Sequence, residues 1–301
     1  MGETAMHTGG MWSMDGPMWM PSQPPTLRRL LDVHLQPVPL LPVLGLLALL
    51  LYLAGVLALR RRGGDWPAPR LASWVAGIAV LEFVTTTGIE GYGMMVFSVH
   101  MVQHMVLAMV VPILLLLGSP VTLALRALPL ENALRRRLVR LLASRFAAAI
   151  LSLPVRWALF LASLYGIYFT PAFGTLMHSV WGHNVMLLHF LVTGWLFFGP
   201  LVSGRSGAPA RLAETFASAP LHALFGLIIL TAHSPVVAFF EHPDPTWSIR
   251  VLPDQSLAGG IAWAASETAT VLVMAIVLVQ WVRGRPRRMV SPRVPSGSAP
   301  G

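Results

Sequence analysis

The chain has 301 residues, of which 55% are hydrophobic and only 11% are charged. An ordinary soluble domain carries roughly 25% charged residues, so this composition excludes a water-soluble globular protein, and its hydrophobicity excludes a disordered one. The sequence contains no Cys and no Lys. The missing Cys excludes disulfides and thiolate metal sites, and the missing Lys excludes a retinal-type Schiff base. We therefore expect an all-α, polytopic membrane protein whose chemistry rests on His, Met, Asp and Glu.

Apolar runs long enough to cross a bilayer, about 20 residues each, divide the chain. They predict seven transmembrane helices, at about 38–59, 71–88, 98–118, 155–170, 181–201, 218–240 and 258–282. The fourth run is the shortest and lies between Pro154 and Pro171. Between the third and fourth runs, Leu alternates with Arg over about 121–145, a pattern typical of an amphipathic helix on the membrane surface. The expected domains are an extracytoplasmic Met/His-rich tail (1–36), a transmembrane domain (37–283) and a disordered cytoplasmic tail (284–301).

The arginines predict the orientation of these helices. All but Arg28, Arg29 and Arg250 fall in the C-terminal tail or in the connections that follow the first, third and fifth runs. Because positively charged loops stay in the cytoplasm, the N-terminus is expected outside and the C-terminus inside. The net charge of +9 then reflects topology and contact with lipid headgroups, not binding to nucleic acid.

Ionisable side chains are costly inside a membrane, so each one is a candidate functional residue. With this orientation, most of the His and carboxylate groups gather in the outer half of the bilayer. The outer loops contribute His178, and the helices contribute Glu82, His100, His104, His183, His189, His233 and, about halfway down, Glu267. His222 alone lies toward the cytoplasmic end, where we expect an interhelical hydrogen bond.

The tightest local pattern is the segment His100-Met101-Val102-Gln103-His104-Met105. On a helix, residues four apart share a face, so His100 lies above His104 and Met101 above Met105. Imidazole and thioether groups together favour Cu(I) over Mg²⁺ or Ca²⁺. His183 and His189, on the fifth run, complete the expected copper site, although one ion is not expected to bind both of them. Interhelical hydrogen bonding by His and gap filling by Met remain the structural alternative.

The N-terminal tail carries a second Met/His pattern, which is rich in Trp, Gly and Pro as well. A flexible segment of this kind on the oxidising side of the membrane can capture copper without thiols, or can rest on the headgroups. Its candidate ligands are Met6, His7, Met11, Met14, Met18 and Met20.

The last apolar run has its own signals at its outer end. Asp254 is expected to act as the N-cap of this helix, and could also steer a cation. Gly259 and Gly260 are expected to allow a neighbouring helix to approach closely. Asp254, Glu82 and Glu267, with His178 and His233, are further candidates for a metal or polar network.

At these residues the chain resembles the CtaG family of integral-membrane assembly factors for haem–copper cytochrome c oxidases. The resemblance covers about 38–283. It is carried by His100 to Met105 with Leu117-Gly118-Ser119-Pro120, Gly182 to Phe190 with Gly194 and Pro200, Asp254-Gln255 with Gly259-Gly260, and Trp263 with Glu267. It implies a role in supplying copper to the catalytic subunit of the oxidase, in a bacterial plasma membrane. Other copper chaperones could be partners, and a dimer is left open.

A delivery role needs no covalent chemistry, so no enzyme activity is expected. Two other functions remain open. The chain could be a redox protein with haem between paired histidines such as His104 and His189, or a copper or proton transporter with Glu82 and Glu267 as relay groups.

Overall fold

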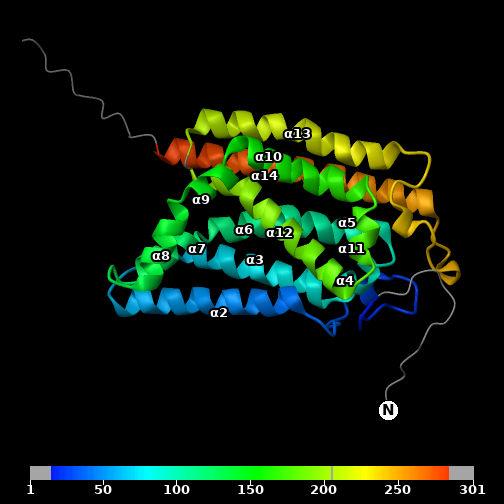
Figure 1. Cartoon of the computed structure of the whole chain (residues 1–301), viewed down its shortest axis with the longest axis horizontal. Helices are drawn as coiled ribbons and strands as arrows, with labels where there is room; N and C mark the ends of the chain where they lie inside the picture. The colour runs from blue at the N-terminus through cyan, green and yellow to red at the C-terminus, as the bar shows by residue number, and fades with distance from the viewer. Residues whose placement is uncertain (1–14, 205, 285–301) are drawn as a thin grey trace, which may run out of the picture.

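The computed structural model describes residues 15–204 and 206–284, and within them the chain is helical with no strand. The long helices lie side by side in one bundle (Figure 1). In chain order the elements are α1 Leu27–Leu31, α2 Leu40–Arg61, α3 Ala68–Thr86, α4 Gly88–Gly93, α5 Phe97–Met105, η1 Val106–Val110, α6 Val111–Leu117, α7 Pro120–Ala127, α8 Ala133–Leu142, α9 Arg145–Ile150, α10 Leu153–Leu161, η2 Ala162–Gly166, α11 Ala172–Met177, α12 Val180–Ser203, α13 Ala208–Thr231, η3 Ala238–Phe240, η4 Pro245–Trp247 and α14 Val251–Gly284.

Six helical stretches of the described chain are long and apolar enough to cross a membrane. They are Leu40–Arg61, Ala68–Thr86, Phe97–Ala127, Val180–Ser203, Ala208–Thr231 and Val251–Arg283. The chain is therefore a multi-pass membrane protein. The fourth expected helix, 155–170, is occupied by α10 and the short π-helix η2 and is not among the six. Much of the exterior is apolar, as on α2, where Leu46, Leu50 and Leu51 are exposed.

The expected boundaries of the sixth run were wrong by about ten residues. Instead of 218–240, the helix α13 covers Ala208–Thr231 and contains Pro220 in its interior. It ends because Pro235 disfavours helical geometry in the residue before it. His233 therefore lies beyond the helix, exposed in the following loop, and not in the outer half of a transmembrane span.

The third span is interrupted by the π-helix η1, between α5 and α6. Pro112, which follows it, has no N–H to give to the carbonyl of Ala108, so the regular hydrogen-bond pattern cannot continue. Helix α12 packs against this turn through Gly194, where a Cβ would lie 2.0 Å from the Ala108 oxygen. The glycine thus allows α12 to contact the altered turn directly.

Helices α13 and α14 pack along each other and form the edge of the bundle, and α14 also packs against α5. A Cβ at Gly259 would lie 2.3 Å from the Leu230 nitrogen, whereas a Cβ at Gly260 would meet nothing within 4 Å. The expected close approach is therefore confirmed for Gly259 and was wrong for Gly260.

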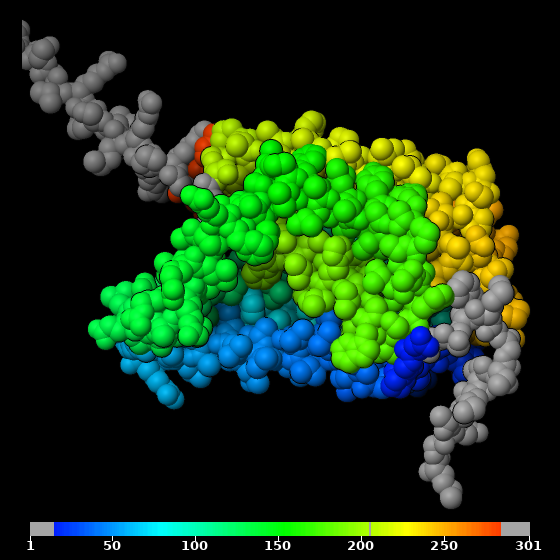
Figure 2. All heavy atoms as spheres, viewed as in Figure 1, coloured from blue at the N-terminus to red at the C-terminus, as the bar shows by residue number. Residues whose placement is uncertain are grey.

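The Arg-rich connections meet at one end of the bundle. Arg62 Nη1 donates to the Ala127 carbonyl at 2.5 Å, and Arg126 Nη2 donates to the Asp65 carbonyl at 3.2 Å. Nearby on the same side, α8 and α9 stand out from the body of the molecule (Figure 2). The grouping of these connections agrees with the distribution of arginines along the sequence.

Candidate functional site

A buried hydrogen-bond chain links the two histidines of α5. The Tyr168 hydroxyl lies 2.8 Å from His100 Nε2 and 2.6 Å from His104 Nδ1, and all three side chains are buried. Tyr168 follows the π-helix η2, on the segment where the fourth span was expected. The His104 ring also stacks on Phe190 of α12, with ring centroids 3.8 Å apart. The site is therefore assembled from α5, α12 and the segment after η2.

The second ring nitrogen of each histidine does not contact Tyr168. Within the described residues, His100 Nδ1 and His104 Nε2 are buried and make no hydrogen bond of standard geometry, and the Gly93 backbone is the polar group that approaches His100. A hydroxyl has one proton, so Tyr168 can donate to one imidazole and accept from the other. In that arrangement one outer nitrogen carries a proton and the other keeps a free lone pair. The bridge thus leaves one neutral imidazole able to bind a metal ion.

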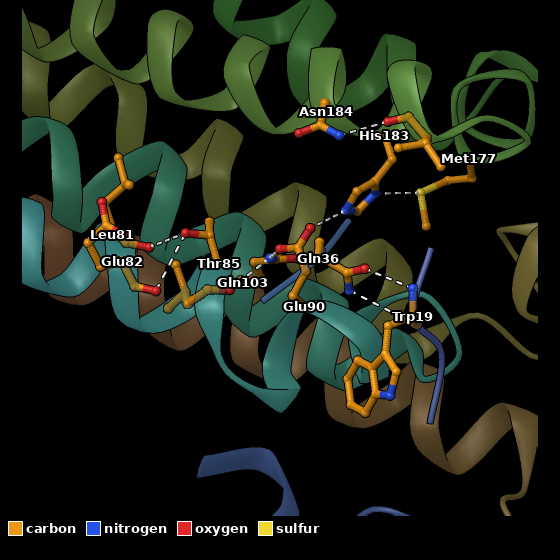
Figure 3. A network of polar contacts seen from close by, with 12 residues as sticks. Trp19, Gln36, Leu81, Glu82, Thr85, Glu90, Gln103, Met177, His183 and Asn184 are labelled. Carbon is orange, nitrogen blue, oxygen red and sulfur yellow. Dashed lines mark hydrogen bonds and ion pairs between the residues drawn. The ribbon is translucent and has the colours of Figure 1, made fainter. Parts of the chain in front are cut away.

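A second polar group surrounds Glu90, on the short helix α4 (Figure 3). Its carboxylate accepts from the Gln103 amide, which also donates to the Val84 carbonyl at 2.9 Å. The other oxygen of Glu90 lies 2.9 Å from His183 Nε2. Glu90, Gln103 and His183 are all buried.

On its opposite side, the His183 ring faces a thioether. His183 Nδ1 lies 3.4 Å from the sulfur of Met177, at the end of α11, and Met177 is buried. The Gln103 side chain that donates to Glu90 lies on α5, between His100 and His104. The Glu90 group and the Tyr168 chain are therefore neighbours, at the end of the bundle opposite the Arg-rich connections (Figure 1).

Asp254 holds this region together in a way that the sequence did not predict. It was expected to cap its own helix, but α14 already begins at Val251. Its carboxylate instead accepts from the backbone N–H groups of Phe97 at 2.8 Å and Ser98 at 3.3 Å, so it caps α5. This cross-helix cap fixes the start of the helix that carries His100 and His104.

The first described residues lie against the same end. Asp15 N donates to the His178 carbonyl at 2.8 Å, and Val180 N donates to the Asp15 carbonyl at 3.1 Å. Further along, the Tyr92 hydroxyl donates to the Gln23 carbonyl at 2.9 Å. Burial raises the pKa of Tyr92 above its usual value near 10, despite the opposing charge of Arg29, so the hydroxyl stays protonated.

The remaining candidate residues are dispersed. His189 is half-buried on α12, within electrostatic range of His104. Met101 and Met105 are buried in the hydrophobic core. His178 is exposed and near Phe239, and Glu267 is exposed on α14. In the part of the chain that the structure describes, no three His, Asp or Glu side chains gather closely enough to hold a metal ion.

Glu82 and His222 have different surroundings from those expected. One Glu82 oxygen is buried against α2, where Gly45 leaves room for it, and has no hydrogen-bond partner among the described residues. His222 Nδ1 lies 3.1 Å from the Ser218 carbonyl of its own helix, so the expected interhelical hydrogen bond was wrong, and its ring packs on Phe160. Of the tail, Met18 packs on the core and Met20 is exposed; Met6, His7, Met11 and Met14 lie outside the described residues.

Sequence reasoning missed four residues of the site: Tyr168, Glu90, Gln103 and Met177. Gln103 lies inside the segment His100 to Met105. The other three, Tyr168, Glu90 and Met177, lie in or beside short helical elements, whose positions depend on tertiary packing. Glu90 is the lone carboxylate in the apolar, glycine-rich stretch 88–93. That isolation of a carboxylate beside a span was an available signal.

Comparison with known proteins identifies relatives of the chain. It is 41% identical over 281 residues to an uncharacterised protein of Mycobacterium bovis and to one of Mycobacterium tuberculosis. The aligned residues cover 89% of this chain and 42% of each relative. A Mycobacterium leprae protein, also uncharacterised, is 39% identical over 243 residues, covering 77% of this chain and 37% of the relative. The chain thus spans about two fifths of the length of these relatives. No solved structure matches it.

The family comparison agrees with the resemblance seen in the motifs. The model of the cytochrome c oxidase caa3 assembly factor family matches residues 50–284, which include five of the six apolar spans and most of the first. That stretch contains both histidines of α5, the Glu90 group and Asp254. The chain therefore belongs to the caa3 cytochrome c oxidase assembly factor family.

Proposed function

We propose that this protein assists the assembly of a haem–copper oxidase by holding Cu(I) at its outer end and passing it to the catalytic subunit of the oxidase. Family membership supports the assembly role. The observation that carries the copper step is the Tyr168 chain, with its two buried histidines and their unpartnered outer nitrogens.

The donors available fit copper as a cargo. Buried nitrogen atoms without a partner are rare in folded proteins and call for an explanation, and metal binding is one. Among the described residues, four imidazole nitrogens are of this kind, at His100, His104, His189 and His222. With no Cys in the sequence, imidazoles and thioethers are the soft donors present, and they suit Cu(I).

Delivery requires that the ion also leaves. Because the Tyr168 bridge leaves one free imidazole lone pair, the described side chains offer a bound Cu(I) ion few ligands at the same time. A site with few ligands exchanges its ion more readily than a closed cage. The oxidase subunit, docked from within the bilayer, would complete the coordination of copper and then remove it.

The distribution of arginines supports an orientation in which copper is handled on the outer side of the membrane. The Arg-rich end faces the cytoplasm and the histidine end faces outward, in a bacterial plasma membrane. The Met/His tail captures copper on the outer side. The activity needs no bond-making beyond ligand exchange and therefore no catalytic residue.

The two alternative functions receive less support. A haem between His104 and His189 would have to displace Phe190, which stacks directly on His104. A proton or copper path through Glu267 is not favoured because Glu267 is exposed on the outer surface of α14 and does not face the bundle.

Metal analysis of the purified protein tests the copper step. We expect bound Cu(I) in the wild type and reduced copper in His100→Ala, His104→Ala and His183→Ala. His233→Ala, an exposed loop histidine, is the matched control and should bind as much copper as the wild type. Unchanged copper in all three site variants would overturn the proposed site.

A further inference from the structure

The contact between His183 and Met177 sets two soft donors side by side. Their atoms, Nδ1 and Sδ, are 3.4 Å apart, and both side chains are buried. The thioether has no proton to donate, so this pair gains little as a hydrogen bond unless Nδ1 carries a proton. The partners of His183 Nε2 decide whether Nδ1 carries a proton.

The Glu90 group sets the position of the His183 proton. The Gln103 amide donates to the Val84 carbonyl and to Glu90, which leaves Glu90 as the acceptor of that contact. The other oxygen of the same carboxylate, 2.9 Å from His183 Nε2, then accepts from a protonated Nε2. With this single proton on Nε2, the ring presents the lone pair of Nδ1 toward the Met177 sulfur.

A carboxylate behind the distal nitrogen of an imidazole is the usual way in which proteins orient a metal-binding histidine and fix its tautomer. The spacing agrees with that role. Two ligands at about 2.0 Å (nitrogen) and about 2.3 Å (sulfur) from one ion, at a roughly tetrahedral angle, lie about 3.5 Å apart. One imidazole and one thioether would select a soft ion such as Cu(I).

We propose that His183 and Met177 form a Cu(I) site, with Glu90 as the residue that positions His183. This inference rests on the proposed function, since it takes copper as the cargo, and it assigns the first ligands on the outer side. Loading is a ligand exchange in which copper remains Cu(I) and the Nε2 proton stays on His183.

The route into this site is given by the chain itself. Met177 and His183 flank the short stretch, 178–180, that is hydrogen-bonded to the backbone of Asp15. Asp15 lies within the Met/His tail and is next to Met14 in the sequence. Copper held by the tail would therefore reach these two ligands before the histidines of α5.

Cu(I) titration of the full chain in detergent, against a chromogenic Cu(I) chelator, tests the site. Met177→Leu keeps the volume of the side chain and removes the sulfur. We expect it to weaken Cu(I) binding by tenfold or more. The matched control is Met274→Leu, because Met274 lies about 30 Å along α14 from Asp254 at 1.5 Å per residue, and it should bind as the wild type does.

The role of Glu90 is tested by a double-mutant cycle. Glu90→Gln should weaken Cu(I) binding when His183 is present and have no further effect on Cu(I) binding in the His183→Asn background. A purely structural role of Glu90 would instead lower the thermal stability equally in both backgrounds. If Met177→Leu misfolds, X-ray absorption of the Cu(I)-loaded wild type should still show sulfur and nitrogen ligands together.

The outcomes separate this site from the proposed function. Wild-type protein that binds Cu(I) with unchanged affinity in Met177→Leu would overturn the His183–Met177 site and leave copper handling intact. So would a loaded wild type with no sulfur ligand. Wild-type protein that binds no Cu(I) would overturn both proposals.

Discussion

The hydroxyl of Tyr168 lies 2.6 Å from His104 Nδ1 and so joins a segment after η2 to the helix that carries the family's histidine motif. The same oxygen reaches His100, one turn earlier, at 2.8 Å. One hydroxyl thus holds two buried imidazoles and decides which of them has a free lone pair.

Tyr168→Phe should therefore destabilise the protein more than a single lost hydrogen bond would. Both imidazoles lose a partner in a buried site, where each unsatisfied group costs about 1–3 kcal/mol. Thermal unfolding in detergent measures this loss. Tyr165→Phe, which loses one bond to the Leu221 carbonyl, is the control, and an equal effect of the two substitutions would contradict the bridging role.

Asp254→Ala should destabilise α5, because the carboxylate caps Phe97 and Ser98 across the helix interface. Loss of a cap costs about 0.5–2 kcal/mol. Hydrogen exchange of the first turn of α5 should increase. Asp244→Ala removes the cap of the separate short helix η4 and should leave the first turn of α5 unchanged. Exchange in α5 as slow in Asp254→Ala as in the wild type would argue against the cross-helix cap.

The adjacent glycines of α14 should respond in opposite ways to alanine. At Gly259 a Cβ would collide with the Leu230 backbone, so Gly259→Ala should separate α13 from α14 and lower the unfolding temperature markedly. At Gly260 the space is open, and Gly260→Ala should stabilise the helix by up to about 1 kcal/mol. Equal effects would show that the two helices are not in close contact at Gly259.

Replacing only one partner of the ion pair between Arg156 and Glu214 should lower the free energy of unfolding strongly. The two groups are 2.7 Å apart, and Arg156 is buried. Arg156→Leu leaves Glu214 unpaired, at a cost of about 3–5 kcal/mol. Adding Glu214→Leu should recover much of that loss, while the exposed Arg137→Leu should have little effect; absence of recovery in the double variant would contradict the pairing.

Much of the fold could be predicted from the sequence because apolar length and arginine position are local signals. The spans α2, α3, α12 and α14 lie close to their expected ranges. The sixth was misplaced because α13 tolerates Pro220 in its interior and ends before Pro235. The fourth is helical over 153–168, through α10, η2 and the two residues after it, and is not among the six spans.

The site was predictable only where its residues repeat along one helix. The spacing of His100 and His104 placed both on one face, but nothing in the spacing could identify Tyr168 as the group between them. The pairing of Asp254 with α5 and of Met177 with His183 is likewise created by packing between elements far apart in the chain. The expected ligands Met101 and Met105 lie in the hydrophobic core.

The most direct test of the account is the copper content of the host's purified haem–copper oxidase in a strain that lacks this protein. We expect oxidase with normal haem and a low ratio of copper to haem, restored by the wild-type gene or by added copper, but not by the His104→Ala gene. Fully copper-loaded, active oxidase in the deletion strain would contradict the account.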